Sequence, residues 1–417
     1  MGKKLKPIKK MEIMDRYQIK NIFKILNLNT VIIFMLFISI ALGQLIKIPS
    51  GNYGGITLID FTISLVALTS LVKLKFLKVA PFYIKSALVF ILICAVSLLL
   101  TPLTLTTNQY LISLSYILRF GAFTFFGFFL YFSPDQFKNK IPSVFLYSGI
   151  TLSVLGVLQI IFFPSLSFLE QFGWDPHFFR AVSTFLDPNF LGGFMVLTLL
   201  SFFPNHTIKK NWTVMLFLIV FATLLLTFSR SSYIMFFVSF LTLSVLRKSI
   251  KLFSLTIILS LILYGANFFY NNIIAAPKNI DREVSANYRV MSWQTGLSVF
   301  EKSPLLGIGF NSYKYALDEY DLIPQRFIEG RAATGNDSSL IFVLATTGIL
   351  GLVSYFVLLI SLLIHGFQSM KSKNNYGIVF IAGLLGLIAQ SFFINALFYP
   401  FYLFWIFTLA AISKPKA

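Results

Sequence analysis

The chain has 417 residues, of which 57% are hydrophobic and 12% are charged, about half the charged fraction of a soluble globular protein. This composition excludes a soluble globular protein, whose surface is exposed to water, and predicts an all-α polytopic membrane protein. The net charge is +19, and a strongly positive charge is a feature of many nucleic-acid-binding proteins. Here the placement of the charges along the chain says more about function than their sum.

Twelve apolar runs follow one another, each near the roughly 17–25 residues that cross a bilayer. They cover residues 29–46, 56–72, 84–101, 111–132, 141–163, 189–204, 212–228, 233–246, 252–270, 338–364, 377–397 and 399–413. The first run and its basic flank resemble a signal peptide. An uncleaved helix is expected instead, because its removal would leave an odd number of spans.

Lys and Arg mark the cytoplasmic side of membrane proteins. With the N-terminus inside, the inner segments hold most of the 34 basic residues and few acidic ones. We therefore expect a basic cytoplasmic segment 1–28, spans one to nine within 29–270, a large extracytoplasmic loop 271–337 with short helices, spans ten to twelve within 338–413, and a cytoplasmic tail 414–417. The positive charge then indicates topology and contact with anionic lipid, and no nucleic acid is expected.

Asp60 and Arg119 lie inside the second and fourth runs. Each costs several kcal/mol in a bilayer unless it is paired or hydrated. They form either an ion pair between helices or part of a polar pathway into a cavity. The single cysteine, Cys94, excludes an internal disulfide, and no Cys/His cluster has the spacing of a metal site, so neither a metal nor a cofactor is expected.

The outer segment 164–188 contains Arg180, which is surrounded in sequence by phenylalanines. This guanidinium either reaches lipid phosphate or binds an anionic substrate. Asp187-Pro188-Asn189 predicts a turn and a helix cap, and the following Gly192-Gly193 permits close helix packing.

Two further arginines lie on the predicted outer side. Arg230 falls in the turn Phe228–Ser232 between two runs, where neighbouring hydroxyls and the guanidinium form a set of anion donors, or where Arg230 serves as an interfacial anchor. Arg289 belongs to a predicted helix over 286–302 whose apolar stripe includes Val290 and Leu297. Because Arg289 lies off that stripe, it is free to face a ligand.

The rest of the large loop predicts a second short helix and a polar end. Pro304 stops the first helix, Gly307-Ile308-Gly309 bends the chain, and Asn311 or Ser312 caps a helix that runs to Tyr320. Both helices are expected on the membrane surface, above a cavity. The loop ends at Asn336-Asp337-Ser338-Ser339, where Asp337 is either a catalytic group or the cap of the tenth span.

A series of motifs resembles the O-antigen ligase and polymerase superfamily. The motifs are Arg180–Asn189, Ser229-Arg230, Arg289 with Trp293, Ser303–Gly309, Asn336–Leu340 and Ala345–Gly351. The resemblance implies an enzyme that transfers lipid-diphosphate-linked glycans on the outer face of the bacterial cytoplasmic membrane without a metal. It also implies that Arg230 and Arg289 hold the diphosphate, while Arg180 opens the Pro-Asn motif.

The sequence departs from the ligase pattern at one position. Ligases of this superfamily usually have a histidine before the asparagine that Asn336 matches, but here that histidine is missing. His177 is the only histidine in the predicted outer segments, and it lies elsewhere in the sequence. The departure favours a polymerase, with Asp337 or Glu301 as the base.

We therefore predict a metal-independent glycosyltransferase that polymerises polyprenyl-diphosphate-linked repeat units into a surface polysaccharide such as a capsule, an exopolysaccharide or an O-antigen-like polymer. The bilayer, a flippase and chain-length regulators are its expected partners. One alternative is a ligase that transfers the glycan to an acceptor. The other is a transporter of lipid-linked oligosaccharide, although the sequence has no internal repeat of the kind common in transporters.

Overall fold

The computed structural model describes residues 29–50, 54–172, 174–204, 210–275, 282–323 and 335–415. The predicted basic segment 1–28 and parts of the predicted large loop, 276–281 and 324–334, lie outside these residues.

Helices dominate the described chain. After a first helix, Asn29–Leu42, they are α2 (Leu58–Thr69), η1 (Ser70–Val79), α3 (Phe82–Leu99), α4 (Thr107–Tyr131), α5 (Asp135–Lys138), α6 (Ile141–Phe162), η2 (Ser167–Phe172), η3 (Ser183–Phe185), α7 (Pro188–Ser201), α8 (Lys210–Leu226), α9 (Arg230–Leu246), α10 (Ile250–Phe269), η4 (Tyr270–Ala275), α11 (Arg282–Lys302), α12 (Tyr313–Glu319), α14 (Ser339–Lys371), α15 (Asn375–Gln390) and α16 (Pro400–Ile412).

Every predicted apolar run coincides with an apolar helix, so the chain is an integral membrane protein. Among the residues that the structure describes, five helical segments are long and apolar enough to cross a bilayer: α3, α4, Asp135–Phe162, Ile250–Ala275 and α14. The other seven apolar helices have 10–17 residues. A count of twelve crossings remains a prediction.

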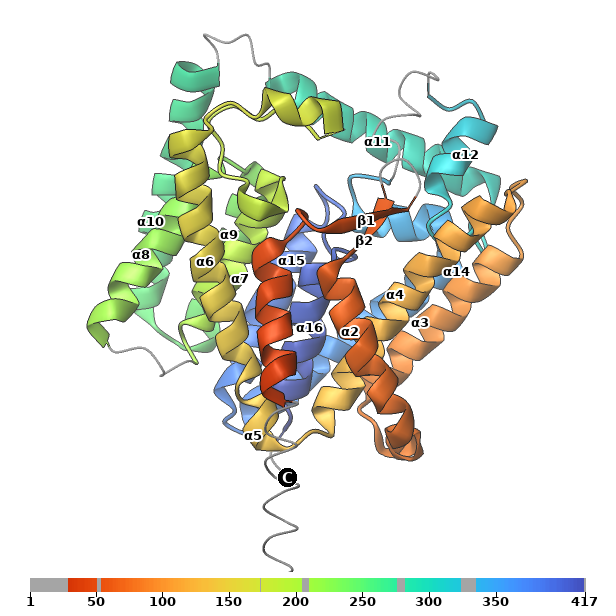
Figure 1. Cartoon of the computed structure of the whole chain (residues 1–417), viewed down its shortest axis with the longest axis horizontal. Coiled ribbons are helices and arrows are strands. Elements are labelled where there is room, and N and C mark those ends of the chain that lie inside the picture. Colours follow the sequence, from red (N-terminus) through yellow and green to blue (C-terminus); the bar gives the residue numbers. More distant parts are fainter. Residues whose placement is uncertain are drawn as a thin grey trace, which may run out of the picture.

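A two-stranded sheet departs from the all-α prediction. Strands β1 (Lys47–Ser50) and β2 (Gly54–Thr57) pair in antiparallel register, with Ile48 opposite Ile56. The sequence between these isoleucines is rich in glycine and asparagine, a combination typical of hairpins that the hydrophobic pattern does not register. The hairpin joins the first helix to α2 (Figure 1).

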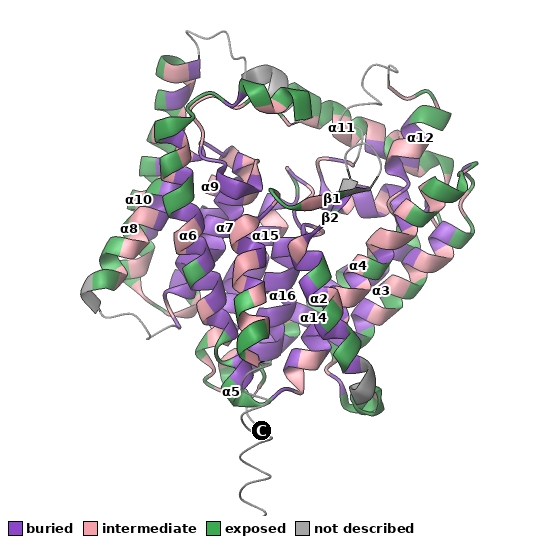
Figure 2. Cartoon of the chain, viewed as in Figure 1, coloured by how far each residue is buried: buried purple, intermediate pink, exposed green. Residues whose placement is uncertain are grey.

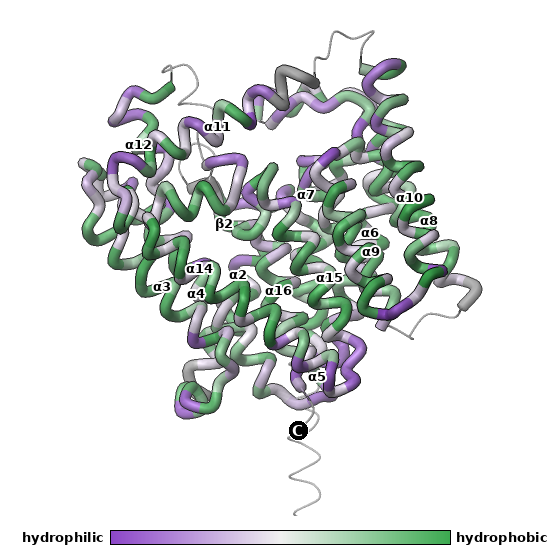
Figure 3. The backbone as a smooth tube through the Cα atoms, turned by 180° about the vertical axis from the view of Figure 1, so that it is seen from behind, coloured by the Kyte–Doolittle hydropathy of each residue, from purple (hydrophilic) through white to green (hydrophobic). Residues whose placement is uncertain are grey.

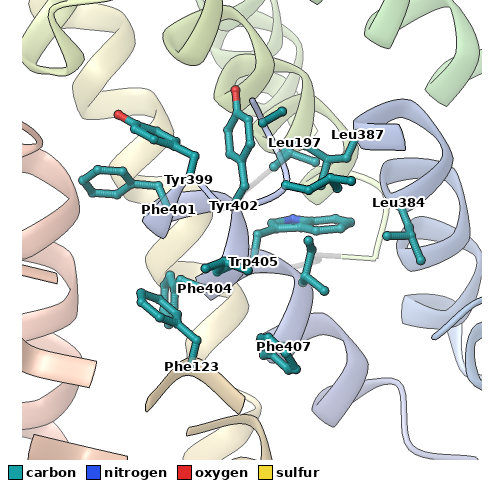
Figure 4. Close-up of a cluster of buried hydrophobic side chains, with 14 of the residues drawn as sticks. Phe123, Leu197, Leu384, Leu387, Tyr399, Phe401, Tyr402, Phe404, Trp405 and Phe407 are labelled. Atoms are coloured by element: carbon teal, nitrogen blue, oxygen red, sulfur yellow. The ribbon is translucent and has the colours of Figure 1, made fainter. Parts of the chain in front are cut away.

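The core of the bundle lies around α16. All 13 residues of this helix are buried, and Figure 2 shows the same concentration of buried residues in its neighbours α7 and α15. A helix that is apolar on all sides belongs in such a position. Its rings, among them Phe404 and Trp405, fill the space between helices (Figure 4). Phe404 stacks on Phe145 with ring centroids 4.6 Å apart, and Trp405 lies against Gly383 of α15.

The predicted surface helices lie at one end of the bundle. α11 and α12 cross the end that is opposite α5 and the C-terminus (Figure 1). This end is more hydrophilic than the middle of the bundle (Figure 3). α11 ends at Lys302, shortly before Pro304, and α12 begins after Ser312, as the sequence predicts. On α11, Val290 and Leu297 are exposed.

The loop segment 303–309 fills a break in α14. Gly348 has φ +64°, which interrupts the helix, and the backbone groups released there bond to the loop. Ile308 and Gly309 donate to the carbonyls of residues 345 and 346, while the amides of residues 349 and 350 donate to the carbonyls of residues 304 and 305. Backbone groups within a bilayer require such partners, and the exchange fixes the outer loop to the tenth predicted span.

Replacing Gly348 by alanine should prevent this docking. A Cβ at Gly348 would come within 2.3 Å of the Leu305 carbonyl oxygen, and positive φ is itself unfavourable for alanine. Gly348→Ala is expected to lower the free energy of unfolding by on the order of 2–4 kcal/mol. The measurement is the thermal midpoint of purified protein in detergent. The control is Gly121→Ala in α4, where no atom lies within 4 Å of the added carbon, and a loss of equal size in both variants would contradict the docking.

Candidate functional site

A cavity of about 930 Å³ lies beneath α11. Its walls come from many parts of the chain. They include the β1–β2 hairpin, α4, the segment from Trp174 to Phe190, η4, α11, the turn before α12, residues 335–337, α14 and the segment from Ile394 to Leu403. Residues distant in sequence therefore meet here. Among the predicted site residues, the lining includes Arg119, Arg180, Arg289 and Asp337.

Arg180 is fixed by the turn between α8 and α9. Its Nε donates to the carbonyl oxygen of Thr227 at 2.8 Å, and burial lowers the pKa of its guanidinium. The surrounding backbone is strained, because the non-glycine residues Phe179, Ser183 and Leu186 have positive φ. Such strain often accompanies functional sites, and here it folds the segment against the wall of the cavity.

Arg230 is the first residue of α9, and a hydrogen-bonded junction fixes that helix end. Ser229 caps α9 and donates to Asn189 Oδ1 at 2.7 Å, while Ser232 Oγ donates to the Asn189 carbonyl at 3.0 Å. A Cβ at Gly192 would come within 2.5 Å of Ser232 Oγ, so this glycine allows the close packing that the sequence predicts. The junction places Arg230 beside the start of α7.

Asp187 caps α7 at the wall of the cavity. Its Oδ1 accepts hydrogen bonds from the amides of Asn189 at 2.6 Å and Phe190 at 3.2 Å. Burial raises the pKa of its carboxyl group, and the two amide bonds oppose that change. The predicted cap at Asp187-Pro188-Asn189 is therefore present.

Asp337 faces the cavity and does not cap α14. The cap is Ser338, whose hydroxyl accepts from the amide of Ile341. Asp337 is positioned through its backbone, because its amide donates to Ser292 Oγ of α11 at 3.1 Å. Burial raises the pKa of Asp337 to about 6, although nearby Arg289 lowers it.

The charged groups lie within electrostatic reach of one another. Burial lowers the pKa of Arg289, with Arg230 acting in the same direction and Asp337 and Asp187 opposing. The positive charge of Arg289 in turn lowers the pKa of Arg180. The structure thus brings together the three predicted arginines and Asp337.

The remaining predicted residues have other positions. Glu301 is exposed near the end of α11 and does not line the cavity. Arg119 Nε forms an ion pair with Asp60 Oδ1 at 3.0 Å, and Arg119 Nη2 donates to the Gly55 carbonyl at 2.6 Å. Arg119 also lines the cavity, so the pair belongs to its wall.

Sequence reasoning missed several lining residues. Asp175 lies close enough to Asp337 to raise its pKa, and His177 lines the same cavity despite its separation in sequence. Asn395 belongs to the segment between α15 and α16, which the sequence presents only as the junction of two apolar runs. Within the described ranges, no group of three or more His, Cys, Asp or Glu residues could hold a metal ion.

Comparison with known proteins gives one family. Residues 215–356 match the family model described as O-Antigen ligase. The match includes Arg230, Arg289 and Asp337, whereas Arg180 and the Asp60–Arg119 pair lie before it. No match to a curated protein was found.

The raised pKa of Asp337 predicts a pH-dependent stability. An unfolded chain exposes this carboxyl group and returns its pKa from about 6 toward 3.8, so the folded protein binds a proton that the unfolded chain has released. Stability therefore falls as the pH rises from about 4 to about 6. Asp337→Asn removes this loss and should raise the free energy of unfolding above pH 6 by on the order of 1–3 kcal/mol, with little effect near pH 4.

Thermal midpoints measured in detergent across this pH range test the expectation. The control is Asp135→Asn at the opposite end of the bundle, where an exposed carboxylate is paired with Lys138. This control should gain no stability above pH 6. Identical midpoints for the wild type and Asp337→Asn at neutral pH would contradict a buried charge at Asp337.

Proposed function

Because residues 215–356 place this chain in the O-antigen ligase and polymerase superfamily, we propose that it polymerises lipid-diphosphate-linked oligosaccharide repeat units into a surface polysaccharide. Glycan transfer of the ligase or polymerase type is the general activity of that superfamily. The choice of polymerisation, of a polyprenyl-diphosphate donor and of metal-independent chemistry is our proposal.

The proposal is carried by Arg180 and Arg289, which line one cavity, and by Arg230, which does not line it but is close enough to lower the pKa of Arg289. A guanidinium presents paired donors that match phosphate oxygens, and a fixed set of them stabilises the charge that a diphosphate gains as it leaves. The N-terminal ends of α7 and α14 also lie at this cavity, and the positive ends of their helix dipoles favour an anion.

Asp337 supplies the base for the transfer. The acceptor hydroxyl oxygen attacks the anomeric carbon of the donor and forms the new glycosidic bond. The bond from that carbon to the diphosphate oxygen breaks, its electron pair leaves with the lipid diphosphate, and the hydroxyl proton passes to the Asp337 carboxylate. With a pKa of about 6, Asp337 is mostly ionised at neutral pH and close to the optimum for a general base.

The distribution of charge supports placing the cavity on the outer face. Lys138, Arg247, Lys371 and Lys414 are at helix ends or the C-terminus on the side opposite α11. By the positive-inside rule this side is cytoplasmic, together with both termini. Lipid-linked repeat units would then be delivered by a flippase, and chain-length regulators would act at the same face of the bacterial cytoplasmic membrane.

His177 supports a ligase as the second candidate. Ligases are expected to activate the acceptor with a histidine, and His177 lines the cavity that contains Arg180, Arg289 and Asp337. A His177→Ala variant that loses all transfer, beside an Asp337→Asn variant that keeps it, would favour the ligase.

Loss of either predicted diphosphate-binding arginine should stop polymer formation. Arg230→Ala and Arg289→Ala are each expected to reduce polymer by on the order of 100-fold, because a transition-state charge loses its donor. Gel analysis of cell-surface glycan measures the product, and immunoblots measure the protein in the membrane. Arg247→Ala is the matched control, since Arg247 follows the other end of α9 and stacks on Phe203 at 5.1 Å. Wild-type chain length in Arg230→Ala and Arg289→Ala at normal protein levels would reject the diphosphate site.

Reconstitution separates the candidate activities. Purified protein in liposomes with the strain's own lipid-linked repeat units should produce longer glycans that remain on the lipid. Transfer only after a different acceptor is added would indicate a ligase. Movement of unextended units across the bilayer would indicate a transporter.

A further inference from the structure

The cavity extends beyond its charged residues to a floor of four aromatic rings, Phe120, Phe310, Phe342 and Phe398. Phe398 is central, with ring centroids 5.6 Å from Phe310, 5.8 Å from Phe342 and 5.9 Å from Phe120. The rings come from α4, from the turn before α12, from α14 and from the segment before α16. We call this set the aromatic floor.

Side-chain amides border the aromatic floor. Asn311 follows Phe310 directly, and Asn395 lies three residues before Phe398. Asn395 Oδ1 is buried and has no hydrogen-bond partner among the described residues. A buried acceptor without a partner is unfavourable, so this oxygen is suited to receive a donor from a ligand or water. Asn311 has φ +62°, in the left-handed region that asparagine adopts more readily than most residues.

The charge of Arg119, which lies at this border, is neutralised by Asp60. Arg119 lies under the ring of Tyr116 at 4.5 Å and is paired with Asp60, whose Oδ2 also accepts from the amide and hydroxyl of Thr57 at 2.8 Å. The guanidinium is therefore engaged by the protein. Aromatic faces, amides and a compensated ion pair suit a neutral, polyhydroxylated ligand better than a second phosphate.

Resting on the proposed function, we propose that the aromatic floor with Asn311 and Asn395 binds a sugar ring of the acceptor glycan. The C–H face of a pyranose packs on Phe398, the partly exposed ring, which the three buried rings hold in place, and the sugar hydroxyl groups bond to the two amides. A polyprenyl chain would also pack on the rings, but it would leave the Asn395 amide buried without a partner.

Residues 335–337 connect this subsite to the charged one. A Cβ on Gly335 would lie 3.6 Å from Asn395 Nδ2, and Asp337 lies two residues further, beside Arg289. A sugar on the aromatic floor can therefore present a hydroxyl group toward Asp337 while the donor diphosphate lies on the arginines. The arrangement separates the acceptor and the donor within one cavity.

The test measures binding of two probes to the full-length protein in lipid nanodiscs. One probe is the oligosaccharide released by mild acid from the strain's own lipid-linked repeat unit, and the other is inorganic pyrophosphate. Asn395→Leu removes the amide at similar volume, and Asn311→Gly removes it while keeping the positive φ. Asn139→Leu, an exposed site at the opposite end, is the control.

We expect Asn395→Leu and Asn311→Gly each to weaken oligosaccharide binding by about three- to tenfold, the loss of a neutral hydrogen bond, and to leave pyrophosphate binding unchanged. Arg289→Ala should show the reverse pattern. Asn139→Leu should change neither. Thermal midpoints identify any variant that binds poorly because it is misfolded, and the other asparagine variant then provides the test.

Unchanged oligosaccharide affinity in a folded asparagine variant overturns the subsite. Tighter binding of polyprenyl monophosphate by Asn395→Leu, with oligosaccharide binding unchanged, overturns it in favour of a lipid-chain site. Failure of the proposed function has a different signature: Arg289→Ala would retain pyrophosphate binding and glycan elongation, whatever the asparagine variants show.

Discussion

The hydrogen bonds around Asn189 are the constraint on which the charged end of the cavity depends. Its side chain accepts from Ser229, and its carbonyl accepts from Ser232 and from Gln390 Nε2 of α15, the latter at 3.0 Å. One residue thereby joins the starts of α7 and α9 to a third buried helix. Arg230 begins the second of these helices, and Arg180 bonds to the turn that precedes it. In the low-dielectric interior such polar bonds are strong, and each one left unmade is costly.

A second constraint holds the opposite wall. The break in α14 accepts the loop segment 303–309, so the chain that leads from α11 to α12 is bonded to the bundle by backbone groups rather than by side chains alone. α14 begins next to Asp337, only a few turns before the break. Asp337, the helix α11 that carries Arg289 and the aromatic residue Phe310 therefore share one rigid support. This explains how a long connection can hold the proposed site residues with little freedom.

The sequence was sufficient to locate the apolar helices and to single out the arginines, whose role stays a prediction, and both have physical reasons. The length of an apolar run directly indicates a membrane-spanning helix, and an arginine at the edge of such a run can have only a few roles. It was insufficient for the hairpin at 47–57, whose signal is short, and for the function of Asn189, which depends on partners 40 and 201 residues away. The sequence could not show that Ser338, and not Asp337, caps α14, because neighbouring Asp and Ser residues have similar capping ability. His177, Asp175 and Asn395 reach the cavity only through tertiary packing, which leaves no local pattern.

The shortness of the buried helices has a consequence for the depth of the chemistry. At about 1.5 Å per residue, the 13 residues of α16 extend about 20 Å, well short of the roughly 30 Å of hydrocarbon in a bilayer. The starts of α7 and α16 line the cavity, so a bilayer that covers the ends of the longer helices would also surround the floor of the cavity. If the proposed lipid-linked donor binds here, its diphosphate meets the arginines close to the acyl chains, where its isoprenoid tail stays dissolved.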